Sequence, residues 1–487
     1  MANTFDKFLR KYLFFVLLFH YQAIAQYHYT ENISQTYLSI LNLEEKKARQ
    51  ELEQYPSESR AWKILLENYL DVLPILLTDN LKDLEKKQER QAERLSQLEN
   101  FPQNSPYYLF FQAEIRAHWA MVYLKIGQPW SAFYEFSKAY YSLTRNQRLY
   151  PHFIPTQKTL GFFQILLGCV PEKYKWIATT IGLKGTIYEG KKMLRDAIQQ
   201  NEWYSKEAQL LLVLSEMYLL NISPENFIKC DASCTVLEKI CNAMIASKKQ
   251  RAFEVKKLLN NLPFYLFFQV PYVAYMRADA FLQTGEYDSA IRWFEYYLNH
   301  TQTTNYIKAS YFKLFLCSWF LNRPDTTRYK IGALQQGSLR NEADKYAFEF
   351  FQTGRLPNKN ITQARFFTDG GEYEKALNAL SFVEPQKLSL YDLAEYYYRY
   401  ARIYHAQKQY DKAFEMYQKA IKHGKHLSTY FAANSDLQLG ILCMEIKKDT
   451  LCAIQHLKQT LSYKKHEYKT SLDAKAQNLL QKIQHRE

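Results

Sequence analysis

Residues typical of phosphate binding occur in the segment 185–192, which reads Gly-Thr-Ile-Tyr-Glu-Gly-Lys-Lys. A phosphate-binding loop of this type places Ser or Thr directly after the first lysine, because that hydroxyl group holds magnesium. Lys192 stands at that position instead, and no strand pattern precedes the segment. We therefore expect no nucleotide cofactor, and we interpret the glycines as residues that permit a bend and a close contact between helices.

Histidine and cysteine are the other residues that could hold a cofactor. His423 and His426 flank a turn without a carboxylate or thiolate close in the sequence, so we expect both side chains to be solvated. The seven cysteines contain no CxxC pair, and no histidine lies close to the group Cys230, Cys234 and Cys241. These spacings do not fit a zinc site, and we predict no metal and no cofactor.

Motifs of catalytic sites are also missing from the sequence. It contains neither HExxH nor GxSxG, and no GxGxxG follows a strand pattern. The acidic residues are spread over predicted helix faces, so no two of them can be assigned as a general acid and base. We predict a non-enzymatic protein with no catalytic residue.

The elements that must position any functional surface are helical. The segment 393–425 contains two amphipathic helices, 393–404 and 410–421, joined by a tight turn. Small residues occur where the two helix axes must approach, and aromatic residues fill the gaps around them. The small residues are Ala401, Ala413 and Ala420, and the aromatic residues are Tyr404, Tyr410 and Tyr417. This segment resembles a tetratricopeptide repeat, in which two antiparallel helices form one unit.

The resemblance implies an all-α protein, a right-handed α-solenoid of stacked helical hairpins. Similar patterns predict further hairpins at 113–141, 271–300, 308–334, 364–383 and 437–461, with a capping helix at 471–483. We divide the chain into a signal segment (1–25), an N-terminal helical region (26–105), an N-terminal array with a glycine-rich hairpin (106–260) and a C-terminal array (261–487). Within the second part, residues 35–55 have the period of a single helix.

In such a stack the first helix of each hairpin lines a concave groove, and its residues outside the core face a ligand. The residues predicted to bind a partner there are Tyr272, Tyr275, Asp279, Glu395, Tyr398, Arg402 and His405. Tyr and Arg are common in binding hot spots. Some tetratricopeptide domains clamp a C-terminal carboxylate with Lys and Asn, but here Tyr398 and Arg402 occupy the corresponding places.

The N-terminus has the pattern of a secretory signal. Lys7, Arg10 and Lys11 precede a short apolar run, and Ala23-Ile24-Ala25 forms a cleavage site before Gln26. We predict export to the periplasm of a Gram-negative bacterium with cleavage after Ala25; an uncleaved anchor is the alternative. Export permits disulfides. Cys230 and Cys234 can pair with each other or with Cys241. Cys443 and Cys452 flank a hairpin turn where they can approach, and the odd number leaves at least one cysteine free.

The charge of the chain is basic, with 63 Lys and Arg against 49 Asp and Glu, a net charge of +14. Because these residues are spread along every helix, we interpret them mainly as solvated faces and expect no nucleic-acid partner; peripheral membrane association stays open. The leading hypothesis is a scaffold of the bacterial envelope that binds a protein or peptide segment in its groove. The alternative is a glycan-binding protein at the outer membrane, which the 40 tyrosines favour.

Overall fold

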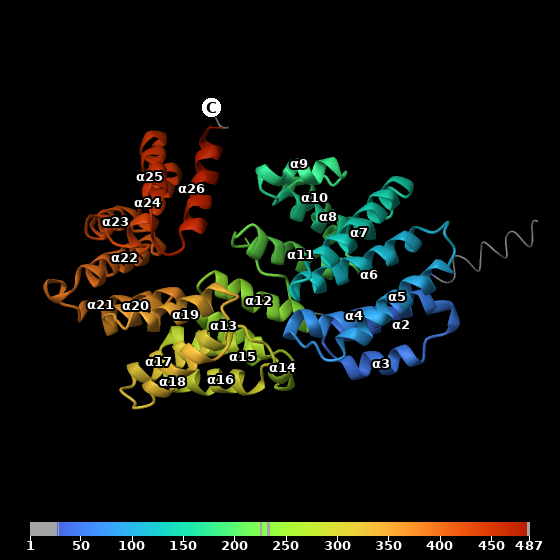
Figure 1. Cartoon of the computed structure of the whole chain (residues 1–487), viewed down its shortest axis with the longest axis horizontal. Helices are drawn as coiled ribbons and strands as arrows, with labels where there is room; N and C mark the ends of the chain where they lie inside the picture. Colours follow the sequence, from blue (N-terminus) through green and yellow to red (C-terminus); the bar gives the residue numbers. More distant parts are fainter. Residues whose placement is uncertain (1–26, 28, 225, 231–233, 485–487) are drawn as a thin grey trace, which may run out of the picture. The chain divides into compact units, whose positions relative to one another are not determined.

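The computed structural model describes residues 27, 29–224, 226–230 and 234–484, and these residues form α-helices without a single strand (Figure 1). The prediction of an all-α fold of paired helices is confirmed, whereas the hand of the array stays a prediction. The predicted signal segment lies outside the described residues. Within the described residues, no helix combines the length and the apolar character needed to cross a membrane.

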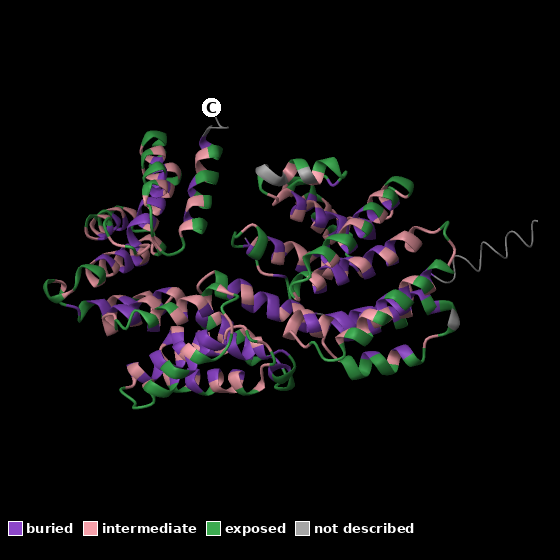
Figure 2. Ribbon diagram, viewed as in Figure 1, coloured by how far each residue is buried: buried purple, intermediate pink, exposed green. Residues whose placement is uncertain are grey.

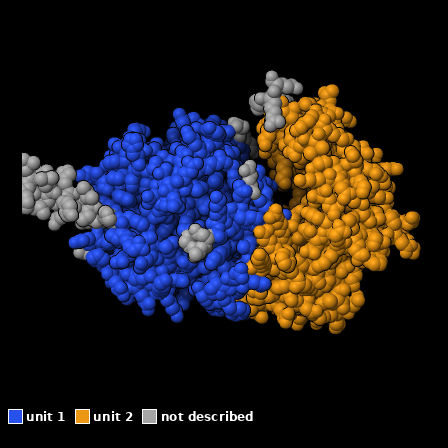
Figure 3. Space-filling model, turned by 180° about the vertical axis from the view of Figure 1, so that it is seen from behind, with its two compact units in different colours: residues 1–249, 258–273, 300–303 blue, residues 250–257, 274–299, 304–487 orange. Residues whose placement is uncertain are grey.

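Two compact units make up the chain, and Figure 3 colours them separately. The first comprises the residues up to 249 together with 258–273 and 300–303, and the second comprises 250–257, 274–299 and 304–487. We refer to them as unit 1 and unit 2. The helix α13 (Ala252–Asn260) contributes residues to both.

The helices of unit 1 are α2 (Glu31–Leu41), α3 (Glu45–Glu53), α4 (Arg60–Thr78), α5 (Leu84–Glu99), α6 (Pro106–Lys125), α7 (Pro129–Leu149), α8 (Pro155–Gly168), α9 (Glu172–Thr180), α10 (Ile187–Gln199), α11 (Ser205–Leu214), α12 (Val236–Lys248) and α14 (Tyr265–Gln269). Helices that follow one another closely in the chain pack as pairs, for example α6 on α7 and α8 on α10. The core of unit 1 therefore lies between hairpins and contains many aromatic rings.

The helices of unit 2 are α15 (Pro271–Thr284), α16 (Tyr287–His300), α17 (Ile307–Phe320), α18 (Thr326–Gln335), α19 (Glu342–Gln352), α20 (Lys359–Gly370), α21 (Tyr373–Ser381), α22 (Leu390–Ala406), α23 (Tyr410–Gly424), α24 (Phe431–Leu442), α25 (Thr450–Ser462) and α26 (Lys469–Gln484). The first three residues of α15 and the last residue of α16 are assigned to unit 1. Helix α22 packs on α23, α23 on α24 and α24 on α25, so these hairpins are stacked.

The contact between α22 and α23 follows the predicted pattern. Ala401, Ala413 and Ala420 are all completely buried, and Tyr417 is buried beside them. Ser389 caps the start of α22, because its hydroxyl oxygen accepts a hydrogen bond from the backbone N–H of Asp392. Small side chains let the helix axes approach, and the tyrosine ring fills the space beside them. Figure 2 shows buried residues along the helix faces that pack together.

Two details of the sequence analysis are corrected by the structure. Residues 35–55 do not form one helix, because the chain turns between α2 and α3, where Leu43 has a φ of 59°. Helix α19 was not predicted. It begins after a recognisable capping residue, Asn341, whose side chain accepts a hydrogen bond from the N–H of Asp344. The other hairpins agree closely; the segment 271–300, for example, is α15 and α16.

Glycines allow α8 and α10 to lie against each other, as the sequence predicts. A Cβ added at Gly190 would lie 2.5 Å from the carbonyl oxygen of Gly161 and 2.8 Å from the backbone nitrogen of Ile165. Replacing Gly190 with alanine should therefore push the two helices apart. Because the added Cβ would clash with backbone atoms, we take the upper part of the cost of overpacking, about 2–3 kcal/mol. Alanine regains about 1 kcal/mol of helix propensity, so we expect a net loss of about 1–2 kcal/mol in the free energy of unfolding.

Chemical denaturation of the Gly190→Ala variant measures this loss, and Gly424→Ala is the matched control. Gly424 is also a helical glycine beside another helix, but its added Cβ would lie 3.3 Å from the nearest atom, the Cβ of Ala394. The control should lose clearly less stability than Gly190→Ala. Equal stability of the Gly190→Ala variant and the wild type would contradict the close approach of α8 and α10.

Candidate binding site in unit 2

Unit 2 contains a cavity of about 430 Å³ between α17, α19, α20, α22 and the segment before α24. It is lined by Phe312, Tyr346, Glu349, Phe350, Thr353, Arg355, Pro357, Thr362, Arg365, Tyr391, Glu395, Ser428, Thr429, Tyr430, Phe431 and Glu467. Seven aromatic or proline rings stand in its wall. A cavity of this size and composition is suited to enclosing small organic groups or side chains.

A second cavity, of about 320 Å³, adjoins the first, because Phe312, Tyr346 and Arg365 line both. Its other lining residues are Asp279, Gln283, Ala309, Lys313, Glu342, Ala343, Phe366, Asp369 and Tyr468. We call the two cavities together the trough. The trough runs from α15 to α24 and lies within unit 2.

Arg365 lies at the junction of the two cavities and is held there by Tyr346. Its Nη1 donates a hydrogen bond of 2.7 Å to the Tyr346 hydroxyl oxygen, and its guanidinium carbon lies 4.9 Å from the centre of the same ring. The contact joins α20 to α19, so two helices of different hairpins define the middle of the trough. A guanidinium group placed over an aromatic face in this way keeps its charge and is partly shielded from water.

The trough is more acidic than the rest of the chain. Six carboxylates line it, against three cations. The carboxylates belong to Asp279, Glu342, Glu349, Asp369, Glu395 and Glu467, and the cations to Lys313, Arg355 and Arg365. Burial raises the pKa of Glu467. Because the whole chain carries a net charge of +14, this local excess of negative charge is a distinct feature of the surface.

Two of the predicted partner-binding residues, Asp279 and Glu395, line the trough. Both are also engaged within the protein. Lys313 Nζ lies 2.6 Å from Asp279, and Arg399 Nη2 lies 2.6 Å from Glu395. Arg399 is buried, so its ion pair fixes the position of the Glu395 carboxylate beside the cavity.

Tyr275 and Tyr398 lie in the core of unit 2, with exposed fractions of 5% and 1%. The Tyr275 hydroxyl oxygen accepts a hydrogen bond from Lys313 Nζ at 2.9 Å, and that of Tyr398 accepts one from Asn434 Nδ2 at 2.6 Å. These hydroxyl groups connect neighbouring helices. The two tyrosines would therefore act on a binding surface indirectly, by fixing the positions of the helices that form it.

The remaining predicted residues are not among those that line the trough. Arg402 donates a hydrogen bond of 3.3 Å to Tyr398, and His405 Nδ1 lies 3.1 Å from the Tyr417 hydroxyl oxygen. Burial and the nearby Arg402 charge lower the pKa of His405 to about 4. Tyr272 belongs to the part of α15 that is assigned to unit 1.

Several lining residues are missing from the sequence prediction, chiefly Tyr346, Glu349 and Phe350 on α19, and Arg365 on α20. A signal for α19 exists in the cap at Asn341 and in the helical spacing of Tyr346 and Phe350. Arg365 has no local signal, because its partner Tyr346 lies on another helix.

Unit 1 contains a second cluster of ionisable groups, buried between α6, α8 and α11. Lys158 Nζ lies 2.5 Å from Glu114 Oε2 and 2.8 Å from Glu207 Oε2. The hydroxyl groups of Tyr37 and Tyr69 donate to the same Glu207 oxygen at 2.6 and 2.7 Å. Burial alone would raise the pKa of Glu207, but the charges of Lys158 and His118 and the hydrogen bonds from Lys158 and Tyr37 together lower it to about 2.

His118 stands beside this cluster, with Nε2 at 3.9 Å from Glu114 Oε2. Burial lowers the pKa of His118 to about 4. The group Glu114, His118 and Glu207 lies close enough together to share a cation. The Lys158 ammonium group already pairs with both carboxylates, so we interpret the cluster as an internal ion pair that holds three helices together.

A comparison with known protein families supports the interpretation of α22 and α23. The model described as "Tetratricopeptide repeat" matches residues 394–422, which fall within these two helices. A comparison with curated proteins found no match. The family match thus covers one hairpin of unit 2 and includes Glu395, one of the two residues of α22 that line the trough.

Proposed function

We propose that this chain, which contains a tetratricopeptide repeat in α22 and α23, is a non-enzymatic scaffold whose trough in unit 2 binds a segment of another protein. Such repeats generally mediate protein–protein interaction. The observation that carries the proposal is the trough itself, two adjoining cavities with aromatic walls on the stacked hairpins. A trough shared by several hairpins suits an extended segment better than a compact small molecule.

The charge of the trough indicates the chemistry of the partner. Six carboxylates against three cations favour a segment rich in Lys and Arg. The aromatic rings of Tyr391 and Tyr430 would contact the aliphatic stems or the charged ends of such side chains. Attraction between these charges should weaken as the salt concentration rises.

Reversing the charge of Glu349 and Asp369 tests this assignment. We expect the Glu349→Lys/Asp369→Lys variant to bind short Lys- and Arg-rich peptides at least about tenfold more weakly than the wild type, equivalent to about 1.4 kcal/mol. Fluorescence anisotropy with basic peptides and acidic peptides of equal length gives the two affinities. The wild type should prefer the basic set, and the preference should decrease in high salt.

Glu374→Lys/Glu415→Lys is the matched control, because it reverses the same number of charges at two exposed carboxylates that do not line the trough. It should bind like the wild type. Equal loss of binding in the control and in the trough variant would assign the effect to overall charge, and a preference of the wild type for acidic peptides would overturn the proposal.

Glycan binding is the second candidate, and the exposed ring of Tyr391 favours it. This ring is 38% exposed and stands in a wall that also contains carboxylates, which can accept hydrogen bonds from sugar hydroxyl groups. A glycan array probed with the wild type and with Tyr391→Ala separates the candidates. Specific glycan signals that disappear in the variant would favour the glycan; basic peptide binding without glycan signals would favour the protein segment.

The setting that we propose is the periplasm of a Gram-negative bacterium, with cleavage after Ala25. The sequence pattern of residues 1–25 supports it, as do two disulfides, Cys230–Cys234 and Cys443–Cys452. Disulfides persist mainly in oxidising compartments outside the cytosol. N-terminal sequencing of protein from a periplasmic extract tests this setting; a chain beginning at Gln26 is expected, and an intact N-terminus in the cytosol would contradict it.

A further inference from the structure

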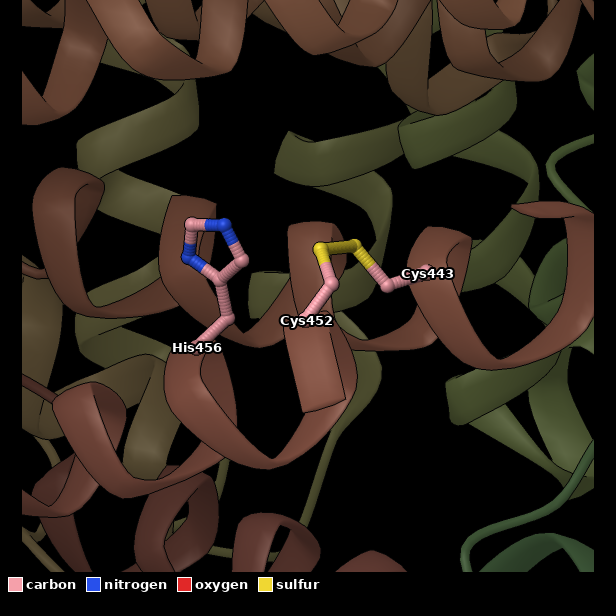
Figure 4. Close-up of side chains that lie close together, drawn as sticks. All are labelled: Cys443, Cys452 and His456. Carbon is pink, nitrogen blue, oxygen red and sulfur yellow. A yellow bond between two sulfur atoms is a disulfide. The ribbon is translucent and has the colours of Figure 1, made fainter. Parts of the chain in front are cut away.

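We propose that reduction of the Cys443–Cys452 disulfide creates a zinc site with the two cysteine sulfurs and His456 Nε2 as ligands. The proposal is independent of the trough. In the structure the sulfurs are bonded to each other. One nitrogen of His456 and both sulfurs lie within 4.8 Å of one another. Figure 4 shows the ring of His456 beside the disulfide.

The backbone brings these three ligands together by local geometry. Cys452 and His456 are separated by four residues on α25, so they share one face of the helix. Cys443 begins η4 (Cys443–Lys447), a π-helical turn that follows α24. The spacing is therefore Cys-x8-Cys-x3-His, which a search for CxxC pairs does not find.

Asp436 of α24 completes the arrangement. Its Oδ1 lies 2.8 Å from His456 Nδ1, and its Oδ2 accepts a hydrogen bond of 2.7 Å from the Tyr463 hydroxyl group. When His456 Nδ1 donates a proton to this buried carboxylate, Nε2 presents its lone pair to a cation. Metal-binding histidines are commonly oriented by a carboxylate in this way.

The residues around the disulfide should keep the helices in place after the two cysteines are reduced to thiols. Cys443 is buried among apolar residues of α24, α25 and α26, including Leu437, Leu457 and Leu472. We expect these apolar contacts to keep the helices together after the disulfide is reduced. Cys452 lies in the first turn of α25, where the helix dipole stabilises a thiolate. Cys452 and His456 are both partly exposed, so water can supply a fourth ligand.

The chemistry requires a reductant, for which we use a phosphine in the presence of water. The disulfide gains two electrons and two protons and becomes two thiols, while the phosphine is oxidised to its phosphine oxide. Zn²⁺ then replaces both thiol protons, and the neutral imidazole adds its lone pair without losing a proton. Oxidation to the disulfide removes the two thiolate ligands and should release the metal.

Zinc uptake by the full chain tests the proposal. After reduction and removal of excess metal, we expect one tightly bound Zn²⁺ per chain, and none in the oxidised protein. Cys443→Ser/Cys452→Ser and His456→Ala should lose this uptake, and Asp436→Asn should weaken it about 10- to 100-fold. The matched control is Cys230→Ser/Cys234→Ser, because the described residues place no histidine with that pair in a metal-binding group. It should bind like the wild type.

A measurement on the unaltered chain covers the case in which a variant fails to fold. Zn²⁺ should protect Cys443 and Cys452 of the reduced wild type from alkylation, as read by mass spectrometry of the peptides. Cys169, a half-buried free cysteine outside the site, should not be protected. Equal alkylation of Cys452 with and without Zn²⁺ would overturn the proposal, as would zinc uptake by His456→Ala equal to that of the wild type.

Discussion

Replacing Lys158 by methionine is expected to lower the free energy of unfolding of unit 1 by about 3–5 kcal/mol, because breaking a buried ion pair leaves an uncompensated charge. Lys158 is completely buried and pairs with Glu114 and Glu207 at 2.5 and 2.8 Å. Methionine has a similar length but no charge, so both carboxylates would remain in the interior without their cation. Chemical denaturation followed by circular dichroism measures the loss.

Lys419→Met provides the control, because Lys419 pairs with Glu415 on the surface of α23. Removing this exposed pair should change stability by less than about 0.5 kcal/mol. The triple variant Lys158→Met/Glu114→Gln/Glu207→Gln should recover part of the stability, since it leaves no buried charge. A Lys158→Met protein as stable as the wild type would contradict the ion-pair interpretation.

Acidification is expected to destabilise unit 1 through His118. The pKa of His118 in the folded chain is about 4, against an ordinary histidine pKa of 6.5, so below pH 6.5 the unfolded chain binds a proton that the folded chain does not. The stability contributed by neutral His118 is complete above pH 6.5 and decreases as the pH falls toward 4. At about 1.4 kcal/mol per pH unit, the loss is about 2 kcal/mol at pH 5 and about 3 kcal/mol at pH 4.

Denaturation of the wild type and of His118→Asn between pH 7 and pH 5 isolates this effect, because the carboxyl groups of the cluster are common to both proteins. Burial raises the pKa of Glu114, whereas the pKa of Glu207 is lowered from the usual 4.5 to about 2. The variant should show the smaller decrease. His426→Asn, which changes an exposed histidine, should retain the wild-type slope. Parallel slopes for the wild type and His118→Asn would show that His118 is protonated equally in both states.

The hairpins of this chain can be predicted because the contacts within them are local. Ala401 and Ala413 lie in consecutive helices joined by a short turn, so the small residues that let the helices approach are close in the sequence. The same pattern identifies α15 with α16 and α20 with α21. The prediction of a single helix over 35–55 is wrong because the helical spacing of apolar residues continues across the turn at Leu43. This turn contains neither Gly nor Pro, so the sequence does not mark it.

The trough could be predicted only in part. Asp279 and Glu395, which were predicted to bind a partner because they stand on the first helices of two hairpins, line the trough; their role in binding stays a prediction. Tyr398 was expected to face a ligand, yet the structure buries it against Asn434 and Arg402, since a tyrosine can close a helix contact and hydrogen-bond at once. The positions of Arg365 and Lys158 are fixed by side chains from other helices. Such pairs cannot be predicted from the pattern of residues within one helix.

Site-specific photo-crosslinking tests the proposed binding role of the trough most directly. A photoreactive residue placed at Tyr391, in the trough wall, and another at Glu415, outside it, can be compared in the living cell. We predict that position 391 captures a protein segment rich in Lys and Arg, that the Glu349→Lys/Asp369→Lys change reduces the yield, and that position 415 does not capture this segment. Capture of the same segments at both positions, or capture at position 391 that the charge reversal leaves unchanged, would contradict the account.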